Sequence, residues 1–375
     1  MKVMILAGGF ATRLWPLTEH RAKPLLLLEG RTIIAHILDT IPREYEIFLL
    51  TNKAFEHDFR MELQKCGRTN FHIFCEDAFS DGEKLGALRA LSLALKEFSI
   101  DDDILLCAGD NLLPELQVQD LKCSSEEARL AVRKVSTFDE ARKFGVVEIN
   151  EELMENAPLC KGGCPKGRGG FGGQEGDFVA QKNQEIIGFE EKPEHPKSKF
   201  VSTGFFSMGK DLFPILHACA ARSPDALGGV FPDILKHGKT IRSIHVRGEW
   251  FDVGSFDSYL EAHQTLQTSG IQKGTNVLEK GNTFSGKVFL GDGCQIKRCR
   301  ITDSIIYPNC VLEDCHISQS VIDEECHLMG LDLNRKLVRK GTKIRENGGE
   351  MYTGSIHVVN DFITSSRQSR NYFTG

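Results

Sequence analysis

The sequence lacks the features that would place the chain in a membrane or on nucleic acid. No apolar run approaches the ~18 residues that a membrane-spanning helix needs, and the run after Lys2 is too short for a signal peptide core. A net charge of −6 provides no general attraction to nucleic acid or to anionic lipid. We therefore expect a cytoplasmic protein that binds neither nucleic acid nor a membrane.

Two established phosphate-binding signatures are also missing, and the cysteines show no disulfide framework. Neither GxxxxGK[ST] nor GxGxxG follows the first apolar segment. The twelve cysteines are scattered along the chain, which favours reduced, packed thiols over disulfides. With 41% hydrophobic and 26% charged residues over 375 positions, the composition is that of a globular protein with a sizeable core.

Short apolar strands alternate with helical patterns over about the first 260 residues. This alternation predicts βαβ units, and therefore an α/β fold with a Rossmann-like mixed, mostly parallel sheet and helices on both faces. Ligands of such sheets bind beyond the carboxyl ends of the strands. The clearest predicted strands are residues 3–9, 46–51, 71–77 and 102–110, and the predicted helices are residues 32–41, 54–67 and 84–98.

The stretch AGGFATRL follows the first predicted strand directly. Gly8 and Gly9 have no Cβ, so the backbone there can turn sharply and present its amides to phosphate oxygens. Arg13 adds a guanidinium that suits a phosphate, and Lys23 before Pro24 adds a second cation on a stiffened segment. A tight turn with a surface arginine would explain an isolated Gly pair better, so the interpretation depends on the rest of the chain.

Seven motifs, in order, resemble those of the sugar-phosphate nucleotidylyltransferases, also called NDP-sugar pyrophosphorylases. They are AGGFATRLWPLTEHRAKPLLLLEGRTII, KLGALRAL, AGDN, FGVVEI, FEEKP, VSTGFF and FDVGS. The resemblance is greatest to the glucose-1-phosphate thymidylyltransferases. Ala11, Ala22, Ala87 and Arg89 depart from the usual residues and leave the nucleotide preference open. Ala11 costs little if its φ is negative and matters if its φ is positive.

The resemblance implies that a hexose 1-phosphate oxygen attacks the α-phosphorus of a nucleoside triphosphate and that pyrophosphate leaves. Both substrates are polyanions, so the protein must mainly position and neutralise them. The catalytic residues would be Arg13, Lys23 and Asp110. The cofactor Mg²⁺ prefers oxygen ligands and would be held by Asp110 and Asp252.

By the same resemblance, the two substrates bind to separate groups of residues. The motif EEKPEHPKSK would otherwise be a commonplace charged turn. Lys192 would hold the sugar phosphate, Glu191 would hold the sugar hydroxyls, and two glycines would let the hexose approach the backbone. The nucleotide-binding residues would be Leu6, Ala7, Gly8, Gly9, Arg13 and Gly86, and the sugar-phosphate-binding residues Gly145, Glu191, Lys192 and Gly204.

A Gly-rich insertion separates FGVVEI from FEEKP, over about residues 151–183. So much glycine buries little apolar surface, and we expect a flexible surface loop. Cys160 and Cys164 supply at most half of a zinc site, because no second nearby pair completes it.

From about residue 286 the sequence repeats every 16 positions. Such a repeat predicts one coil of a parallel β-helix per period, with small and branched residues stacked inside. The cysteines of the repeat are then interior fillers rather than ligands. The residues that superpose include Cys294, Cys310 and Cys326, Cys299 and Cys315, and the pairs Ile305–Val321 and Ile306–Ile322.

We predict a catalytic domain over residues 1–265, a short left-handed β-helix over 275–345 and a tail, 346–375, without assigned structure. About three coils are visible, which suits contacts in a homo-oligomer. Alternatives within the class are mannose-1-phosphate guanylyltransferase and UTP–glucose-1-phosphate uridylyltransferase. Two alternatives of another class are a non-catalytic regulatory homologue and a β-helix acyltransferase, for which His316 and His327 would face outward.

Overall fold

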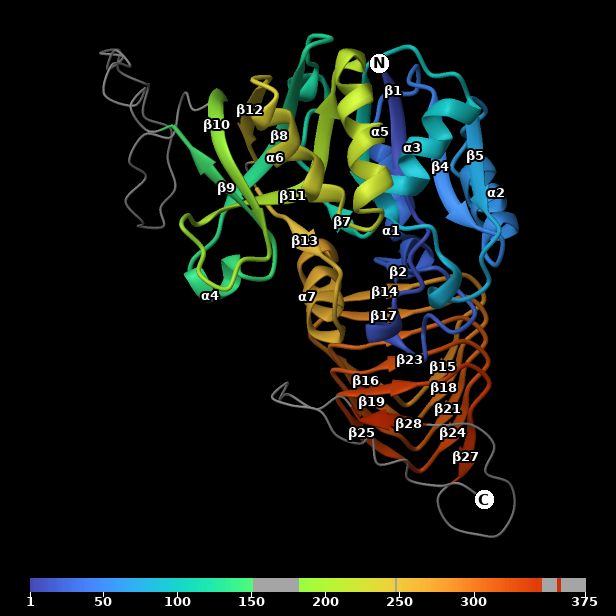
Figure 1. Cartoon of the computed structure of the whole chain (residues 1–375). Coiled ribbons are helices and arrows are strands. Elements are labelled where there is room, and N and C mark those ends of the chain that lie inside the picture. The colour runs from blue at the N-terminus through green and yellow to red at the C-terminus, as the bar shows by residue number, and fades with distance from the viewer. Residues whose placement is uncertain (151–181, 247, 346–355, 359–375) are drawn as a thin grey trace, which may run out of the picture.

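The computed structural model describes residues 1–150, 182–246, 248–345 and 356–358. A layered α/β part lies above a stack of parallel β-coils (Figure 1). The predicted insertion with Cys160 and Cys164 lies outside the described residues except for positions 182 and 183, and so does most of the predicted tail. Of the helices that the structure describes, none is long and apolar enough to cross a membrane.

The first half of the main sheet is parallel. β1 (Lys2–Leu6) lies between β4 (Ile47–Asn52) and β6 (Ile104–Ala108), and β5 (Phe71–Glu76) forms the edge beyond β4. The three inner strands are nearly continuous runs of buried residues, as expected for strands covered on both faces. The strands predicted for this half are confirmed.

Helices cover both faces of this sheet. The helices are α1 (Ile33–Asp39), α2 (Glu56–Lys65), α3 (Ala87–Glu97), α4 (Phe138–Ala141), α5 (Phe213–Arg222), α6 (Val230–Lys236) and α7 (Phe256–Leu266). All of them except α4, whose Ala141 packs in a separate small cluster, contribute to the two main hydrophobic clusters. Val3 and Ile5 pack into a hydrophobic cluster with α1, α2 and α7, whereas Met4 packs into a second cluster with α3, α5 and α6. Alternate strand residues therefore face opposite helix layers, and the predicted two-sided α/β fold is confirmed.

The second half of the sheet is mixed. β11 (Phe200–Met208) runs antiparallel to β6, and beyond it lie β8 (Glu127–Lys134), β12 (Thr240–His245), β10 (Lys182–Glu191) and β9 (Gly145–Ile149). β8 and β12 are parallel, and the other pairings among these strands are antiparallel.

Two short antiparallel strand pairs lie outside the main sheet. β2 (Leu27–Leu28) pairs with β3 (Arg31–Thr32) just before α1. β7 (Asn111–Leu112), directly after β6, pairs antiparallel with β13 (Phe251–Asp252), directly before α7. The second pair brings the chain around Asp252 back to the carboxyl end of β6.

The lower part is a parallel β-helix with three sheets (Figure 1). From β17 onward, residues paired between parallel strands are 16 positions apart, as in Gln295–Val311 and Val311–His327. The stack starts earlier than the sequence repeat, because β14 pairs with β17 at a spacing of 17, as in Ile271–Val288. The described chain therefore forms more coils than the three that were predicted.

The three sheets of the β-helix are short-stranded. The first consists of β14 (Ile271–Lys273), β17 (Val288–Leu290), β20 (Ile305–Ile306), β23 (Val321–Ile322), β26 (Lys336–Val338) and the antiparallel β28 (Ile356–Val358). The second consists of β15 (Leu278–Lys280), β18 (Gln295–Lys297), β21 (Val311–Glu313), β24 (His327–Met329) and β27 (Lys343–Arg345). The third consists of β16 (Thr283–Ser285), β19 (Arg300–Thr302), β22 (His316–Ser318) and β25 (Asp332–Asn334).

The five cysteines of the repeat are buried inside the coils, as predicted. The thiols of Cys294, Cys310 and Cys326 each donate to a carbonyl 13 residues further on, over 3.0–3.1 Å. The described cysteines are free thiols. One assignment was wrong, because Ile305 and Val321 do not point inside but pack in the hydrophobic cluster shared with the α/β part.

Candidate active site

The carboxyl ends of β1 and β6 are held together by main-chain hydrogen bonds. Gly109 donates its N–H to the Leu6 carbonyl over 2.8 Å, and Ala7 donates to the main chain of β4 over 2.8 Å. The Asn52 side chain donates to the Gly8 carbonyl over 3.1 Å. The turn that carries the predicted nucleotide-binding residues therefore starts from a fixed backbone.

Gly8 faces the carboxylate of Glu76 at the end of β5. A Cβ on Gly8 would lie 2.7 Å from Glu76 Oε1. The other carboxylate oxygen accepts the N–H of Leu85 over 2.7 Å, just before Gly86, whose φ is 92°. Burial raises the pKa of Glu76. Glu76 was not predicted, and its place at the end of an apolar strand, like that of Asp110, was the available signal.

Ala11 adopts the left-handed conformation, with φ 46° and ψ 50°. The Thr18 hydroxyl donates to its carbonyl over 2.9 Å. A residue with a Cβ is destabilised in this region by on the order of 1 kcal/mol. Alanine in place of the usual glycine at position 11 therefore lowers stability. Arg13 follows in the short helix η1 (Thr12–Leu14) with an exposed side chain, and none of the ion pairs between described residues involves it.

Lys23 and Asp110 form a direct ion pair, with Nζ 2.7 Å from Oδ2. The contact depends on Gly109, because a Cβ there would lie 3.1 Å from Pro24 Cγ and 2.6 Å from a β1 carbonyl oxygen. Burial alone raises the pKa of Asp110, but Lys23 and a hydrogen bond from Asn111 outweigh burial and hold that pKa below its usual value. The Asp110 side chain is 36% exposed, so a ligand can reach the carboxylate.

Asp252 reaches the same place through the β7–β13 pair. Its backbone partner is Asn111, and the N–H of Val253 donates to the Asp110 carbonyl over 3.0 Å. The two aspartates that the sequence separates by more than a hundred positions are therefore held on adjacent backbone segments.

The charges that act on Asp252 all come from other predicted site residues. Burial raises the pKa of Asp252 and the negative charge of Asp110 raises it further, whereas Lys23, Lys192 and Arg13 lower it. Two carboxylates and three cations thus share one electrostatic environment. Within the described ranges, no group of three or more His, Cys, Asp or Glu side chains could hold a metal, so an ion here would complete its shell with water or substrate oxygens.

Asn111 orients Asp110. Its amide nitrogen donates to Asp110 Oδ1 over 2.9 Å, and its amide oxygen accepts the indole N–H of Trp250 over 2.8 Å. Gly204, with φ 81°, is required beside it, because a Cβ there would lie 2.9 Å from Ala108 Cβ. Neither Asn111 nor Trp250 was predicted, although Asn111 directly follows Asp110 in the AGDN motif.

Three of the four predicted sugar-phosphate residues, Gly145, Glu191 and Lys192, lie together at the end of β10, whereas Gly204 lies apart from them beside Asn111. Glu191 pairs with Gly145 of β9, and a Cβ on Gly145 would lie 2.4 Å from the ring of Phe189. A Cβ on Gly228 would lie 2.4 Å from the Glu191 carboxylate. Lys192 follows with φ 46°, and its ammonium lies 3.8 Å from Glu191 with 64% of the side chain exposed.

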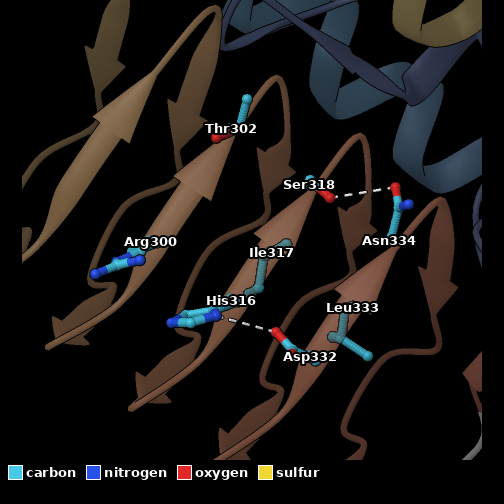
Figure 2. A pocket seen from close by; sticks show the side chains of 8 residues that line it. All are labelled: Arg300, Thr302, His316, Ile317, Ser318, Asp332, Leu333 and Asn334. Atoms are coloured by element: carbon cyan, nitrogen blue, oxygen red, sulfur yellow. Dashed lines mark hydrogen bonds and ion pairs between the residues drawn. The ribbon is translucent and has the colours of Figure 1, made fainter.

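A separate pocket of about 420 Å³ lies on the third sheet of the β-helix (Figure 2). His316 and Asp332 form an ion pair over 3.2 Å on this face, and Ser318 donates to Asn334 over 3.2 Å. Both His316 and His327 are exposed, as predicted. The pocket includes none of the predicted site residues, and its lining mixes polar side chains with Arg300, Ile317 and Leu333.

Comparison with known proteins gives one family profile and a set of remote relatives. The profile, described as "Nucleotidyl transferase", matches residues 2–269. A glucose-1-phosphate thymidylyltransferase of Streptomyces griseus is 22% identical over 310 residues, which is 80% of this chain and 76% of that protein. The UTP–glucose-1-phosphate uridylyltransferase AglF of Haloferax volcanii is 26% identical over 280 residues, or 72% of this chain and 99% of that protein.

Longer relatives and a solved structure also match. The bifunctional protein GlmU of Methanocaldococcus jannaschii is 24% identical over 295 residues, which is 78% of this chain and 61% of that protein. A crystal structure from Bacillus anthracis, described as a candidate glucose-1-phosphate thymidylyltransferase with sucrose, matches with a TM-score of 0.54. The match has 22% identity and covers 72% of this chain and 96% of that one, which supports the fold.

Proposed function

Because this chain belongs to the nucleotidyl transferase family, we propose that it joins a hexose 1-phosphate to a nucleoside triphosphate and releases pyrophosphate. The observation that carries the proposal is the meeting of Lys23, Asp110 and Asp252 beside the turn after β1. Two polyanions must be brought together with one oxygen of the sugar phosphate in line with the α-phosphorus. A glycine turn that starts from a hydrogen-bonded backbone and lies beside cations and carboxylates suits that task.

Arg13 and Lys23 neutralise the triphosphate in this proposal. Arg13 has no ion-pair partner among the described side chains and is exposed, so its guanidinium is available for phosphate oxygens. Lys23 pairs with Asp110 in the absence of substrate and exchanges that contact for phosphate when the nucleotide arrives. Both cations then neutralise negative charge on the departing pyrophosphate.

Asp110 and Asp252 fit a divalent cation. Burial and the negative charge of Asp110 raise the pKa of Asp252, and Asn111 keeps an oxygen of Asp110 in a defined orientation. Carboxylate oxygens supplemented by water and phosphate are the ligands that Mg²⁺ prefers. When bound, the ion would neutralise phosphate oxygens and make the α-phosphorus more electrophilic.

Glu191 and Lys192 bind the sugar phosphate in the same proposal. Glu191 lies beside Gly145 and Gly228, which have no Cβ and so leave room for its carboxylate, and that carboxylate can accept hydrogen bonds from sugar hydroxyls. Lys192 is exposed, and its charge acts on Asp252. The sugar phosphate would therefore approach from the β9–β10 side and the nucleotide from the β1 side.

We propose glucose 1-phosphate and a thymidine nucleotide as the substrates, which follows the relatives from Streptomyces. Mannose 1-phosphate with a guanosine nucleotide, and glucose 1-phosphate with UTP as in the Haloferax relative, are the alternatives. A matrix of nucleoside triphosphates against hexose 1-phosphates, followed by pyrophosphate release, tests all three. Release with no pair would contradict the proposed reaction and favour a non-catalytic homologue, and turnover of acetyl-CoA would favour an acyltransferase.

A further inference from the structure

The segment that carries Lys23 is attached to the β-helix at three separate points. It runs from Leu17 to Leu28 between the turn after β1 and α1, and its last residues form β2, which lies beside the first coils in Figure 1. The partners on the β-helix are between 280 and 320 residues away in the sequence. This attachment goes beyond simple packing, because each point uses oriented polar groups.

Arg21 makes the central attachment. Its guanidinium lies 4.8 Å from the centre of the Tyr307 ring, and its two terminal nitrogens reach Asp323 over 3.2 Å and Glu324 over 2.5 Å. The Arg21 side chain is 15% exposed and that of Asp323 4%. Burial raises the pKa of Asp323, and the adjacent Arg21 counteracts that rise.

Two flanking contacts fix the ends of the segment. Glu19 accepts two hydrogen bonds from Arg339 of the β-helix, over 2.6 and 2.5 Å. At the other end, Leu27 donates its N–H to the hydroxyl of buried Tyr307 over 2.9 Å and accepts from Tyr259 over 2.6 Å. The main chain is therefore held on both sides of Lys23.

A buried ion pair of this kind is a poor way to gain stability. The free energy needed to remove two charges from water is about as large as the free energy gained from their attraction. Apolar residues of similar volume often stabilise a protein equally well. Such a pair does fix the relative position of the two segments, because the planar guanidinium donates its hydrogen bonds in only a few directions. Arg21 is joined to Lys23 by the buried Ala22 alone, and Pro24 stiffens the chain on the other side.

We propose that Arg21 is a positioning residue, through which Asp323, Glu324 and Tyr307 of the β-helix hold the Lys23 ammonium against the site of phosphate transfer. The β-helix thereby takes part in the reaction without touching either substrate. The inference rests on the proposed function of Lys23. A displacement of about 1 Å at a reacting centre can lower a rate by up to about 100-fold. A small increase in the mobility of the segment that carries Lys23 should therefore lower kcat measurably.

The test is a double-mutant cycle with Arg21→Met and Lys23→Ala, read by steady-state pyrophosphate release. Arg21→Met should lower kcat by about 10- to 100-fold and leave KM for the hexose 1-phosphate within about threefold, because Glu191 and Lys192 lie on another part of the sheet. In the Lys23→Ala background the same change should lower kcat less than about twofold, because the group it positions is gone. Arg298→Met is the matched control, since Arg298 also binds a Glu–Asp pair, Glu313 and Asp314, on an exposed part of the β-helix.

If Arg21→Met lowered kcat equally in the wild-type and Lys23→Ala backgrounds, its effect would not act through Lys23, and the inference would be overturned. A folded Arg21→Met protein with the kcat of wild type would overturn it as well. If Arg21→Met does not fold, Asp323→Asn, which keeps an acceptor for Arg21, should show the same pattern with a smaller loss. Hydrogen exchange separates this inference from the proposed function. Absence of pyrophosphate release by the wild type would contradict the proposed reaction. Unchanged amide hydrogen exchange over residues 19–28 in Arg21→Met would contradict the positioning role of Arg21.

Discussion

The ammonium of Lys23 lies 2.7 Å from the Asp110 carboxylate, 87 positions away in the sequence, where a short helix and the end of β6 meet. The pair joins a candidate phosphate ligand to a candidate metal ligand. Replacing either side chain should therefore affect the reaction far more than the fold.

We expect Lys23→Ala and Asp110→Ala each to lower the rate of pyrophosphate release by about 100- to 1000-fold, equivalent to ~3–4 kcal/mol of lost transition-state stabilisation. Circular dichroism should show a folded protein in both cases. Lys53→Ala is the control, because Lys53 forms an exposed ion pair with Glu56 over 2.9 Å. Rates within tenfold of wild type in both variants would contradict the mechanism.

Removal of divalent metal should abolish the reaction, because two adjacent carboxylates at the site repel phosphate unless a cation lies between them. Activity should be lost after treatment with a chelator and return with added Mg²⁺. Asp252→Asn should need a higher Mg²⁺ concentration for half-maximal rate, since one anionic ligand is lost. Full activity in chelated enzyme would rule out the metal.

Gly109→Ala should lower stability by about 1–3 kcal/mol, because its Cβ would lie 2.6 Å from the Leu6 carbonyl oxygen and 3.1 Å from Pro24 Cγ. The catalytic rate should fall as well, since Pro24 moves with Lys23. Gly82→Ala is the control, because a Cβ there meets nothing within 4 Å. Denaturant midpoints that fall equally for the two variants would show that close packing at Gly109 has no special role.

Ala11→Gly should raise the free energy of unfolding by about 0.5–1 kcal/mol, because glycine adopts a φ of 46° without steric cost. Part of the gain is offset by the greater freedom of glycine in the unfolded chain. Thermal unfolding of Ala11→Gly against Ala54→Gly, at an exposed position, measures the difference. A loss of stability at both positions would contradict the assigned conformation.

His263 of α7 should make stability depend on pH. Burial lowers its pKa to about 4, and Lys287 adds to the effect. The pKa of the ring in the unfolded chain is ~6.5, so the unfolded state binds a proton more readily than the folded state. The neutral ring therefore contributes up to about 3 kcal/mol to the free energy of unfolding above that pH, and this contribution is lost as the pH falls from there through about 4. His263→Leu should flatten the fall in stability between those values, whereas the exposed His57→Gln should not. Identical pH profiles for wild type and His263→Leu would refute the assignment.

Local patterns were enough to predict most of the fold. The apolar runs that became β1, β4 and β6 are buried on both faces, and the spacing of 16 that aligned Cys294, Cys310 and Cys326 is the pairing register of the coils. Periodicity of this kind is visible in a sequence because burial repeats with the geometry of each element. The repeat could not show that Ile305 points outward and Ile306 inward, because both are apolar. Ile305 is buried only because the α/β part packs against that face of the β-helix.

The sequence by itself determined the family, the alternation of strands and helices, the coil period and the types of residue at the candidate site. Only the tertiary structure decided that Glu76 faces Gly8, that Asn111 and Trp250 orient Asp110, and that the β-helix holds Arg21 through Asp323. The physical reason is distance along the chain. A period repeats within a few residues of itself, whereas these contacts join segments up to 302 positions apart, and their partners are selected by how whole layers pack together.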